Sequence, residues 1–126
     1  MKFRYINFLI ALMIILVASC SIKEQRGEVW VRGRGVTSSF ELHKDGTYVS
    51  KENCDICPER EVRGVWRRDA KTLVLSARSG APNQVLVELD YRGCHGYVPV
   101  EQSFKTDKLF PTDIYFRWRD ECARHL

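Results

Sequence analysis

Cysteine and histidine side chains in this sequence lie close enough along the chain to bind a metal ion or to take part in redox chemistry. They form three pairs: Cys54 with Cys57, Cys94 with His95, and Cys122 with His125. Thiolate and imidazole groups bind Zn²⁺ or Cu(I), and a C-x-x-C motif such as that in "ENCDICPERE" also occurs in redox proteins. A third interpretation is that the four cysteines form structural disulfides.

Local sequence context ranks these interpretations. Redox C-x-x-C motifs of the thioredoxin kind begin a helix within a βαβ unit, where the helix N-terminus lowers the thiol pKa, and no such pattern surrounds Cys54. Neighbouring residues on a strand point to opposite faces, so Cys94 and His95 would not both reach one ion. Structural disulfides are the preferred prediction, a metal site comes second and redox activity third. No cofactor is predicted.

Catalytic patterns are not identifiable in the sequence. No serine lies in a nucleophile-elbow motif that would support a Ser-His-Asp triad. His43 alternates with Phe40 and Leu42, which predicts that it faces solvent. Glu59 and Glu61 lie among arginines, a pattern typical of an exposed charged strand. The sequence therefore predicts a protein that is not an enzyme.

The fifth cysteine, Cys20, follows an apolar N-terminal segment. Lys2 and Arg4 form a short basic start, and residues 8–18 are uncharged and shorter than the roughly 20 apolar residues that span a bilayer. The residues Val17-Ala18-Ser19 before Cys20 resemble the bacterial lipobox. Alternatives are an ordinary cleaved signal, with Cys20 as a disulfide partner, and an uncleaved anchor helix.

The lipobox resemblance implies an anchored protein. Residues 1–19 would be a lipoprotein signal peptide, Cys20 would carry diacylglyceryl and acyl groups such as palmitate, and residues 20–27 would be a lipidated tether. Several acyl chains anchor a protein far more firmly than one. Ser21 takes the place where aspartate would favour inner-membrane retention, so the resemblance implies the outer membrane, facing the periplasm, rather than the inner membrane.

Charge and cysteine number narrow the class of protein further. Removing the signal leaves 18 basic and 16 acidic side chains, so the net charge falls from +4 to +2, which argues against nucleic acid as a partner. With Cys20 lipidated, an even set of four cysteines remains, as expected for disulfides in an oxidising periplasm. Four cysteines allow three connectivities, and the sequence does not choose among them.

Residues 28–126 form one predicted domain in which turns alternate with short strands. In "FELHKDGTYV" the Asp45-Gly46 turn predicts a hairpin, and a three-residue loop with Gly46 left-handed would place Phe40, Leu42 and Tyr48 on one face. A two-residue loop would instead place Val49 on the face of Leu42.

Further strands are expected along the rest of the domain. A second hairpin turns at residues 68–71 and returns through Leu73 and Leu75. Residues 85–91 alternate, with Val85, Val87, Leu89 and Tyr91 opposite Leu86, Glu88 and Asp90. Near the end, Ile114, Phe116 and Trp118 are expected on one face, and "ECARHL" could add a helical turn. The predicted fold is mainly β: a small, disulfide-stabilised antiparallel barrel or sandwich of about six to eight strands.

The order "FELHKDGTY", "GVW" and "LVLSA" resembles the paired hairpins of small lipocalin-like bacterial lipoproteins, including one that signals envelope and copper stress. This resemblance covers about residues 40–77. In the stress lipoprotein the C-x-x-C precedes the D-G-T-Y-type turn, whereas Cys54 and Cys57 follow it here.

Two classes of function follow. The first is an anchored, non-catalytic interaction module with an envelope protein as partner, of inhibitor, immunity, exclusion or docking type. The alternative is a lipoprotein that binds a small ligand or copper or zinc, or senses envelope stress, using a barrel interior lined by aromatics or a site drawn from the three Cys and His pairs.

Overall fold

The computed structural model describes residues 27–126, so the predicted signal peptide, Cys20 and nearly all of the predicted tether lie outside the described residues. Within residues 27–126 the chain forms eight strands and three 3₁₀ helices, and none of these helices is long and apolar enough to cross a membrane. The strands are β1 (Glu28–Arg32), β2 (Ser38–Leu42), β3 (Thr47–Cys54), β4 (Cys57–Asp69), β5 (Thr72–Ala77), β6 (Gln84–Tyr91), β7 (Cys94–Pro99) and β8 (Tyr115–Arg117). The helices are η1 (Val100–Lys108), η2 (Pro111–Asp113) and η3 (Glu121–His125).

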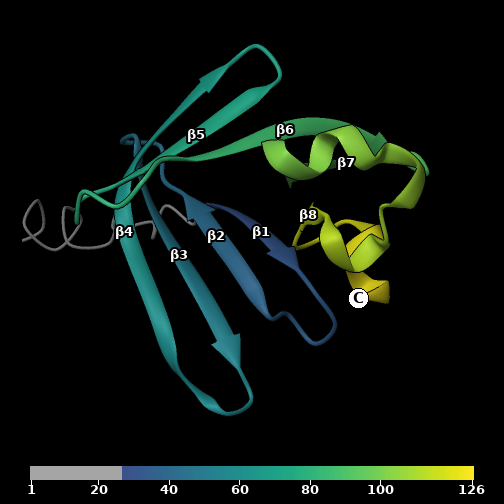
Figure 1. The fold of residues 1–126 in the computed structure, drawn as a ribbon, viewed down its shortest axis with the longest axis horizontal. Coiled ribbons are helices and arrows are strands. Elements are labelled where there is room, and N and C mark those ends of the chain that lie inside the picture. The colour runs from purple at the N-terminus through teal and green to yellow at the C-terminus, as the bar shows by residue number, and fades with distance from the viewer. Residues whose placement is uncertain (1–26) are drawn as a thin grey trace, which may run out of the picture.

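The eight strands form a closed antiparallel barrel in sequence order, β1 to β8 (Figure 1). Closure occurs where the short β8 pairs with β7 on one side and with β1 on the other, through Trp30↔Arg117 and Val31↔Phe116. The prediction of a small, mainly β, disulfide-stabilised domain is confirmed, and the structure is a barrel rather than a sandwich. Closing a sheet in this way leaves no unpaired edge at β1 or β8.

The hairpin between β2 and β3 forms at the predicted three-residue loop. Gly46 has a φ of +87°, a conformation that costs glycine little, and Leu42 pairs with Tyr48. The Asp45 carboxylate accepts hydrogen bonds from the Thr47 hydroxyl at 2.6 Å and the Thr47 amide at 2.9 Å, which lower the pKa of Asp45. Phe40, Leu42 and Tyr48 are all buried on one face, as expected.

The inside of the barrel is filled by aromatic and leucine side chains. The rings of Trp30 and Tyr97 meet edge-on with centroids 4.8 Å apart, and Phe40 lies 5.0 Å from Tyr115. The buried cluster comprises Trp30, Phe40, Leu42, Tyr48, Leu73, Leu75, Leu86, Tyr97 and Tyr115. These aromatics therefore pack against one another as a core.

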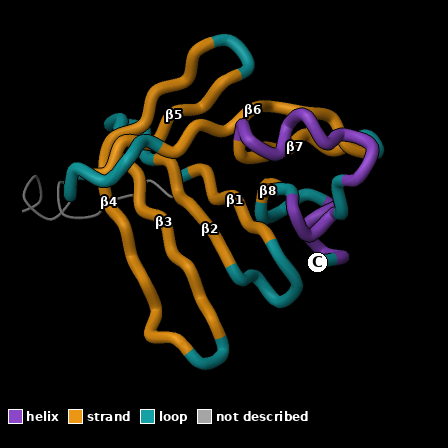
Figure 2. Tube along the Cα trace, in the orientation of Figure 1, coloured by secondary structure: helices purple, strands orange, loops and turns teal. Residues whose placement is uncertain are grey.

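A second cluster covers the outside of β6, β7 and β8. Residues next to inward-facing ones point outward, so Val98 and Phe116 belong to this cluster whereas Tyr97 and Tyr115 belong to the inner one. Figure 2 shows the helical segments grouped on this side of the barrel. Residues packed against it include Leu89, Tyr91, Cys94, Leu109, Cys122, Ala123 and Leu126. Both faces of β6 are thus apolar, because Leu86 faces the inner core and Leu89 the outer cluster.

The C-terminal segment confirms one expectation and corrects another. Residues Glu121–His125 form η3, the expected helical turn. Ile114 and Phe116 are fully buried, but Trp118, expected on the same face, is 54% exposed. The reason is that β8 ends at Arg117, so the alternation of faces does not extend to Trp118.

Candidate functional site

The β3–β4 hairpin extends beyond the barrel (Figure 1). β3 pairs with β4 from Thr47↔Val65 to Cys54↔Cys57, whereas β5 pairs with β4 only from Gly64 onward. Every residue from Lys51 to Glu61 is exposed. We call residues 51–61 the hairpin tip.

The apex of the hairpin tip is a two-residue turn closed by a disulfide. Cys54 and Cys57 pair across the turn, their sulfurs are bonded and their Cα atoms are 5.0 Å apart. Between them lie Asp55 and Ile56, and Ile56 is 97% exposed. The apex therefore presents an aliphatic side chain on a covalently closed turn.

Contacts away from the disulfide also hold the hairpin tip. The Asn53 amide donates a hydrogen bond to the Thr37 carbonyl at 2.8 Å, which joins the hairpin to the β1–β2 loop. Across the ladder, Lys51 Nζ lies 3.6 Å from a Glu59 carboxylate oxygen and 3.9 Å from one of Glu61. Exposed ion pairs of this kind contribute little to stability, but they favour one arrangement of the strands.

The hairpin tip is acidic, whereas the rest of the described domain is basic. Outside the hairpin tip, residues 27–126 hold 14 basic and 11 acidic side chains. The tip has two basic residues and four acidic ones: Lys51, Arg60, Glu52, Asp55, Glu59 and Glu61. The negative charge of the hairpin tip therefore suits a partner surface of positive charge.

The register places the hairpin tip at the opposite end of the barrel from Gly27. Glu28, at the start of β1, pairs with Leu42, which pairs with Tyr48. At the other end of β1, Arg32 pairs with Ser38, which pairs with Glu52, and the apex lies beyond. At about 3.3 Å per residue, the six steps from Tyr48 to Cys54, the last residue of β3, span about 20 Å along the strand. We call the end at Gly27 the N-terminal pole.

The barrel mouth at the N-terminal pole contains a polar cavity of ≈ 410 Å³. Arg68 Nη2 lies 3.4 Å from a Glu28 carboxylate oxygen, and His95 Nε2 lies 3.2 Å from one of Glu88. The lining residues are Glu28, Trp30, Arg68, Glu88, His95, Tyr97, Arg117 and Asp120. Burial raises the pKa of Tyr97, and the neighbouring Arg68 opposes part of this effect.

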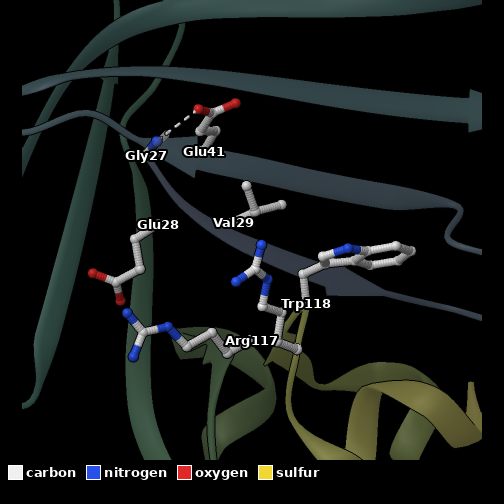
Figure 3. Close-up of a pocket in the computed structure, with 7 residues that line it drawn as sticks. Gly27, Glu28, Val29, Glu41, Arg117 and Trp118 are labelled. Atoms are coloured by element: carbon white, nitrogen blue, oxygen red, sulfur yellow. Dashed lines mark hydrogen bonds between the residues drawn. The ribbon is translucent and has the colours of Figure 1, made fainter. Parts of the chain in front are cut away.

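A larger pocket of ≈ 610 Å³ lies beside the mouth, where the described chain begins. Figure 3 shows Glu28 on one side of it and the indole of Trp118 on the other, with Val29 between. The amide of Gly27 donates to Glu41 Oε1 at 3.0 Å, which fixes the entry of the chain into β1. Arg117 and Arg119 also line this pocket.

All four predicted disulfide cysteines are oxidised in the structure. Cys54 bonds to Cys57, and Cys94 bonds to Cys122, which selects one of the three connectivities. The second bridge fastens the start of η3 to the start of β7 across 28 residues, with a Cα separation of 6.3 Å.

The alternative metal ligands are not brought together. The first disulfide lies in the hairpin tip, whereas the second lies at the outer cluster, and sulfurs bonded to each other are not thiolate ligands. His95 faces carboxylates of Glu88 and Asp90, and His125 ends η3. Within residues 27–126, no three Cys, His, Asp or Glu side chains lie close enough to hold one ion.

Glu59 and Glu61, which the sequence assigned to solvent, are exposed, whereas His43 is half-buried and lies just beyond the end of β2. His43 Nδ1 lies 3.0 Å from the Thr47 hydroxyl and its Nε2 3.4 Å from Glu41, beside the hairpin loop. Glu61 lies in the hairpin tip and pairs with Arg63 at 2.6 Å.

Sequence reasoning did not single out Ile56 or the exposure of Trp118. The exposure of Ile56 could have been predicted from its place in the C-x-x-C motif. When the two cysteines pair across the hairpin, the two residues between them form the turn and cannot be buried in a strand. The exposure of Trp118 could be predicted only by knowing that β8 ends at Arg117.

Comparison of the chain with models of protein families, with curated proteins and with solved structures finds no match. The lipobox and lipocalin-like resemblances therefore stay predictions.

Proposed function

We propose that this protein is a lipid-anchored lipoprotein of the bacterial envelope that acts as a non-catalytic interaction module for another envelope protein. The observation that carries the proposal is the position of the hairpin tip, a disulfide-closed turn with Ile56 at its apex, at the opposite end of the barrel from Gly27. A chain anchored through Cys20 would then leave its hairpin tip free to meet a partner.

The chemistry of the hairpin tip defines the partner. Burying an isoleucine side chain contributes about 1.5–3 kcal/mol, so Ile56 can serve as an anchor residue in an apolar pocket. The carboxylates around it favour a basic rim on that pocket. Because the turn is closed before binding, little conformational entropy is lost on association. Inhibitor, immunity, exclusion and docking proteins all fit this description.

One edge of the projecting hairpin has no strand partner, but the residues along that edge disfavour the addition of another strand. Residues 57–62 of β4 have β3 as their one strand partner within the described chain, so their outer edge is open. Pro58 and the charged residues from Glu59 to Glu61 lie along it. Proline and charged side chains block pairing with another strand, so recognition is assigned to the apex rather than to this edge.

Site-specific photocrosslinking in intact cells tests the proposal. A photoreactive amino acid replaces Ile56 in the full chain, and the matched control carries it at Ala70, in the exposed turn between β4 and β5 near the N-terminal pole. We expect one defined protein adduct from position 56 and none from position 70. The crosslinked peptide of the partner should be rich in lysine and arginine.

Binding of the identified partner to purified lipoprotein then measures the contribution of the apex. Ile56→Ser should weaken binding about tenfold or more, since each 1.4 kcal/mol lost is a factor of ten. The same adducts from positions 56 and 70, or an unchanged affinity of Ile56→Ser, would contradict the assignment of the hairpin tip.

Small-ligand binding is the second candidate function, favoured by the cavity of ≈ 410 Å³ at the barrel mouth. Charges of both signs line it, so a zwitterion such as a short peptide fits better than a simple anion. A rise in melting temperature with such peptides, lost in Glu88→Gln, would support this function.

A further inference from the structure

Trp118 is exposed close to the point where the predicted tether joins the barrel. Its side chain is 54% accessible to solvent, although tryptophan is one of the residues that gain most from burial. The Trp118 amide donates to the Val29 carbonyl at 2.9 Å, so its backbone is held beside the first residues of β1. The exposed indole is thus fixed at the N-terminal pole.

The two carboxylates that line the pocket beside Trp118 are those of Glu28 and Glu41. Glu28 accepts a hydrogen bond from the Trp30 indole at 3.0 Å and pairs with Arg68 at 3.4 Å. The other acid of the pocket, Glu41, accepts the Gly27 amide and lies 3.4 Å from His43. Both carboxylates therefore have partners within the domain.

Arg117 and Arg119 come from the same segment as Trp118 and line the same pocket. Figure 3 shows Arg117 beside Trp118 in this pocket. Neither forms an ion pair with another residue in the described range 27–126. We call Arg117, Trp118 and Arg119 the basal surface. It combines one exposed indole with two guanidinium groups.

The length of the predicted tether brings the basal surface near the bilayer. Cys20 precedes Gly27 by seven residues, which span about 25 Å at most when fully extended. Tryptophan concentrates at the headgroup level of membranes, and arginine is attracted to anionic lipid phosphates. The basal surface has this composition and lies at the end of the barrel that the tether reaches.

We propose that the basal surface docks onto the anionic headgroups of the membrane that holds the acyl chains. The indole of Trp118 enters the interface and the arginines contact lipid phosphates. Docking places the barrel upright, with the hairpin tip pointing away from the bilayer. This inference rests on the proposed lipidation of Cys20 and adds an orientation to it.

Fluorescence quenching by brominated lipids tests the docking. The full lipidated chain is reconstituted in vesicles of phosphatidylethanolamine and phosphatidylglycerol with bromines near the headgroups. We expect a loss of tryptophan emission that is absent in Trp118→Phe, because Trp30 is buried in the barrel core and Trp66 packs against that core, with its indole N–H donating to the His43 carbonyl at 2.8 Å. As the matched control, the double variant Trp118→Phe/Ile56→Trp carries its tryptophan at the distal apex and should lose no emission to the lipid.

Substitution of single arginines tests whether their attraction to anionic headgroups contributes to docking. Arg119→Gln should lower the ratio of docked to undocked protein about fivefold, as expected for one charge near an anionic leaflet. Arg78→Gln, at an exposed residue after β5, should leave the quenching unchanged. Equal effects of the two substitutions would overturn the assignment of the basal surface.

The remaining outcomes separate this inference from the proposed function. Intact mass shows whether Cys20 is acylated, and an unacylated chain overturns both the anchor and the docking. An acylated chain whose Trp118 is not quenched overturns the docking alone. A third outcome is that Trp118 is shielded from acrylamide both in detergent and in vesicles but is not quenched by lipid bromines. The tether, rather than lipid, would then occupy the pocket, and docking would also be overturned.

Discussion

The hydroxyl groups of Ser38 and Tyr115 lie 2.8 Å apart inside the barrel and join β2 to β8 across the intervening β1. Both residues are buried, and they are 77 positions apart in the sequence. This bond lies close to the seam at which the short β8 closes the barrel, so it links closure to a single polar contact.

Removing either hydroxyl should destabilise the fold. Tyr115→Phe and Ser38→Ala each leave a buried hydroxyl without this partner, which costs about 1–3 kcal/mol. Urea unfolding followed by tryptophan fluorescence measures the loss. The double variant should lose less than the sum of the two single variants, and strictly additive losses would show that the two hydroxyls do not act together.

Gly64 is the position on β4 where the strand passes from the projecting hairpin into the barrel. A Cβ placed there would lie 2.8 Å from Tyr48 Cε1 and would meet the Ser76 carbonyl oxygen. Gly64→Ala should therefore cost about 1–3 kcal/mol through overpacking. Gly46→Ala is the comparison, because its Cβ meets nothing within 4 Å and the cost there is conformational. A Gly64→Ala variant as stable as wild type in urea would contradict the close approach.

The two disulfides should differ in their effect on stability. The loop closed by Cys94 and Cys122 spans 28 residues and that closed by Cys54 and Cys57 only 3. Because the loss of chain entropy grows with loop length, replacing Cys94 and Cys122 by serine should cost about 3–4 kcal/mol, and replacing Cys54 and Cys57 about 2 kcal/mol or less. Calorimetry of the two double variants measures this order, and a reversed order would refute it. Partner binding should show the opposite order, since only the Cys54–Cys57 disulfide shapes the hairpin tip.

Stability should fall at alkaline pH because of two buried phenols. Burial raises the pKa of Tyr48 and Tyr97 above the ordinary value of 10.0. The folded protein then holds these protons more tightly than the unfolded chain, so their contribution is complete below pH 10.0 and is lost as pH rises through the raised pKa values. Urea midpoints should fall less steeply with pH in Tyr48→Phe/Tyr97→Phe than in wild type, and parallel curves would rule out this linkage.

Local chemistry explains which parts of the fold could be predicted. The Asp45-Gly46 turn set the register of the β2–β3 hairpin, because a left-handed glycine determines which residues share a face. Leu73 and Leu75 are buried as their alternation indicated. A barrel could not be told from a sandwich, since closure depends on three residues of β8 that pair with strands far away in sequence.

Other parts of the structure depend on tertiary position, which sequence periodicity does not contain. Disulfide connectivity follows from where η3 packs, and the approach of Cys122 to Cys94 involves residues 28 positions apart. Leu86 and Leu89 are both buried because the C-terminal segment covers the outside of β6. Of the candidate site, the exposed carboxylates were foreseeable, whereas the position of the apex opposite Gly27 required the full strand register.

The register of β1 also determines how the domain would respond to mechanical load. The strand is paired along its whole length with β2, from Glu28↔Leu42 to Arg32↔Ser38, and near its middle with β8. Tension applied between Gly27 and the hairpin tip would run along these strands, perpendicular to their hydrogen bonds. The bonds would then be sheared together rather than opened one after another. A domain pulled between a membrane and a partner would in this way resist force at the strand by which it is attached.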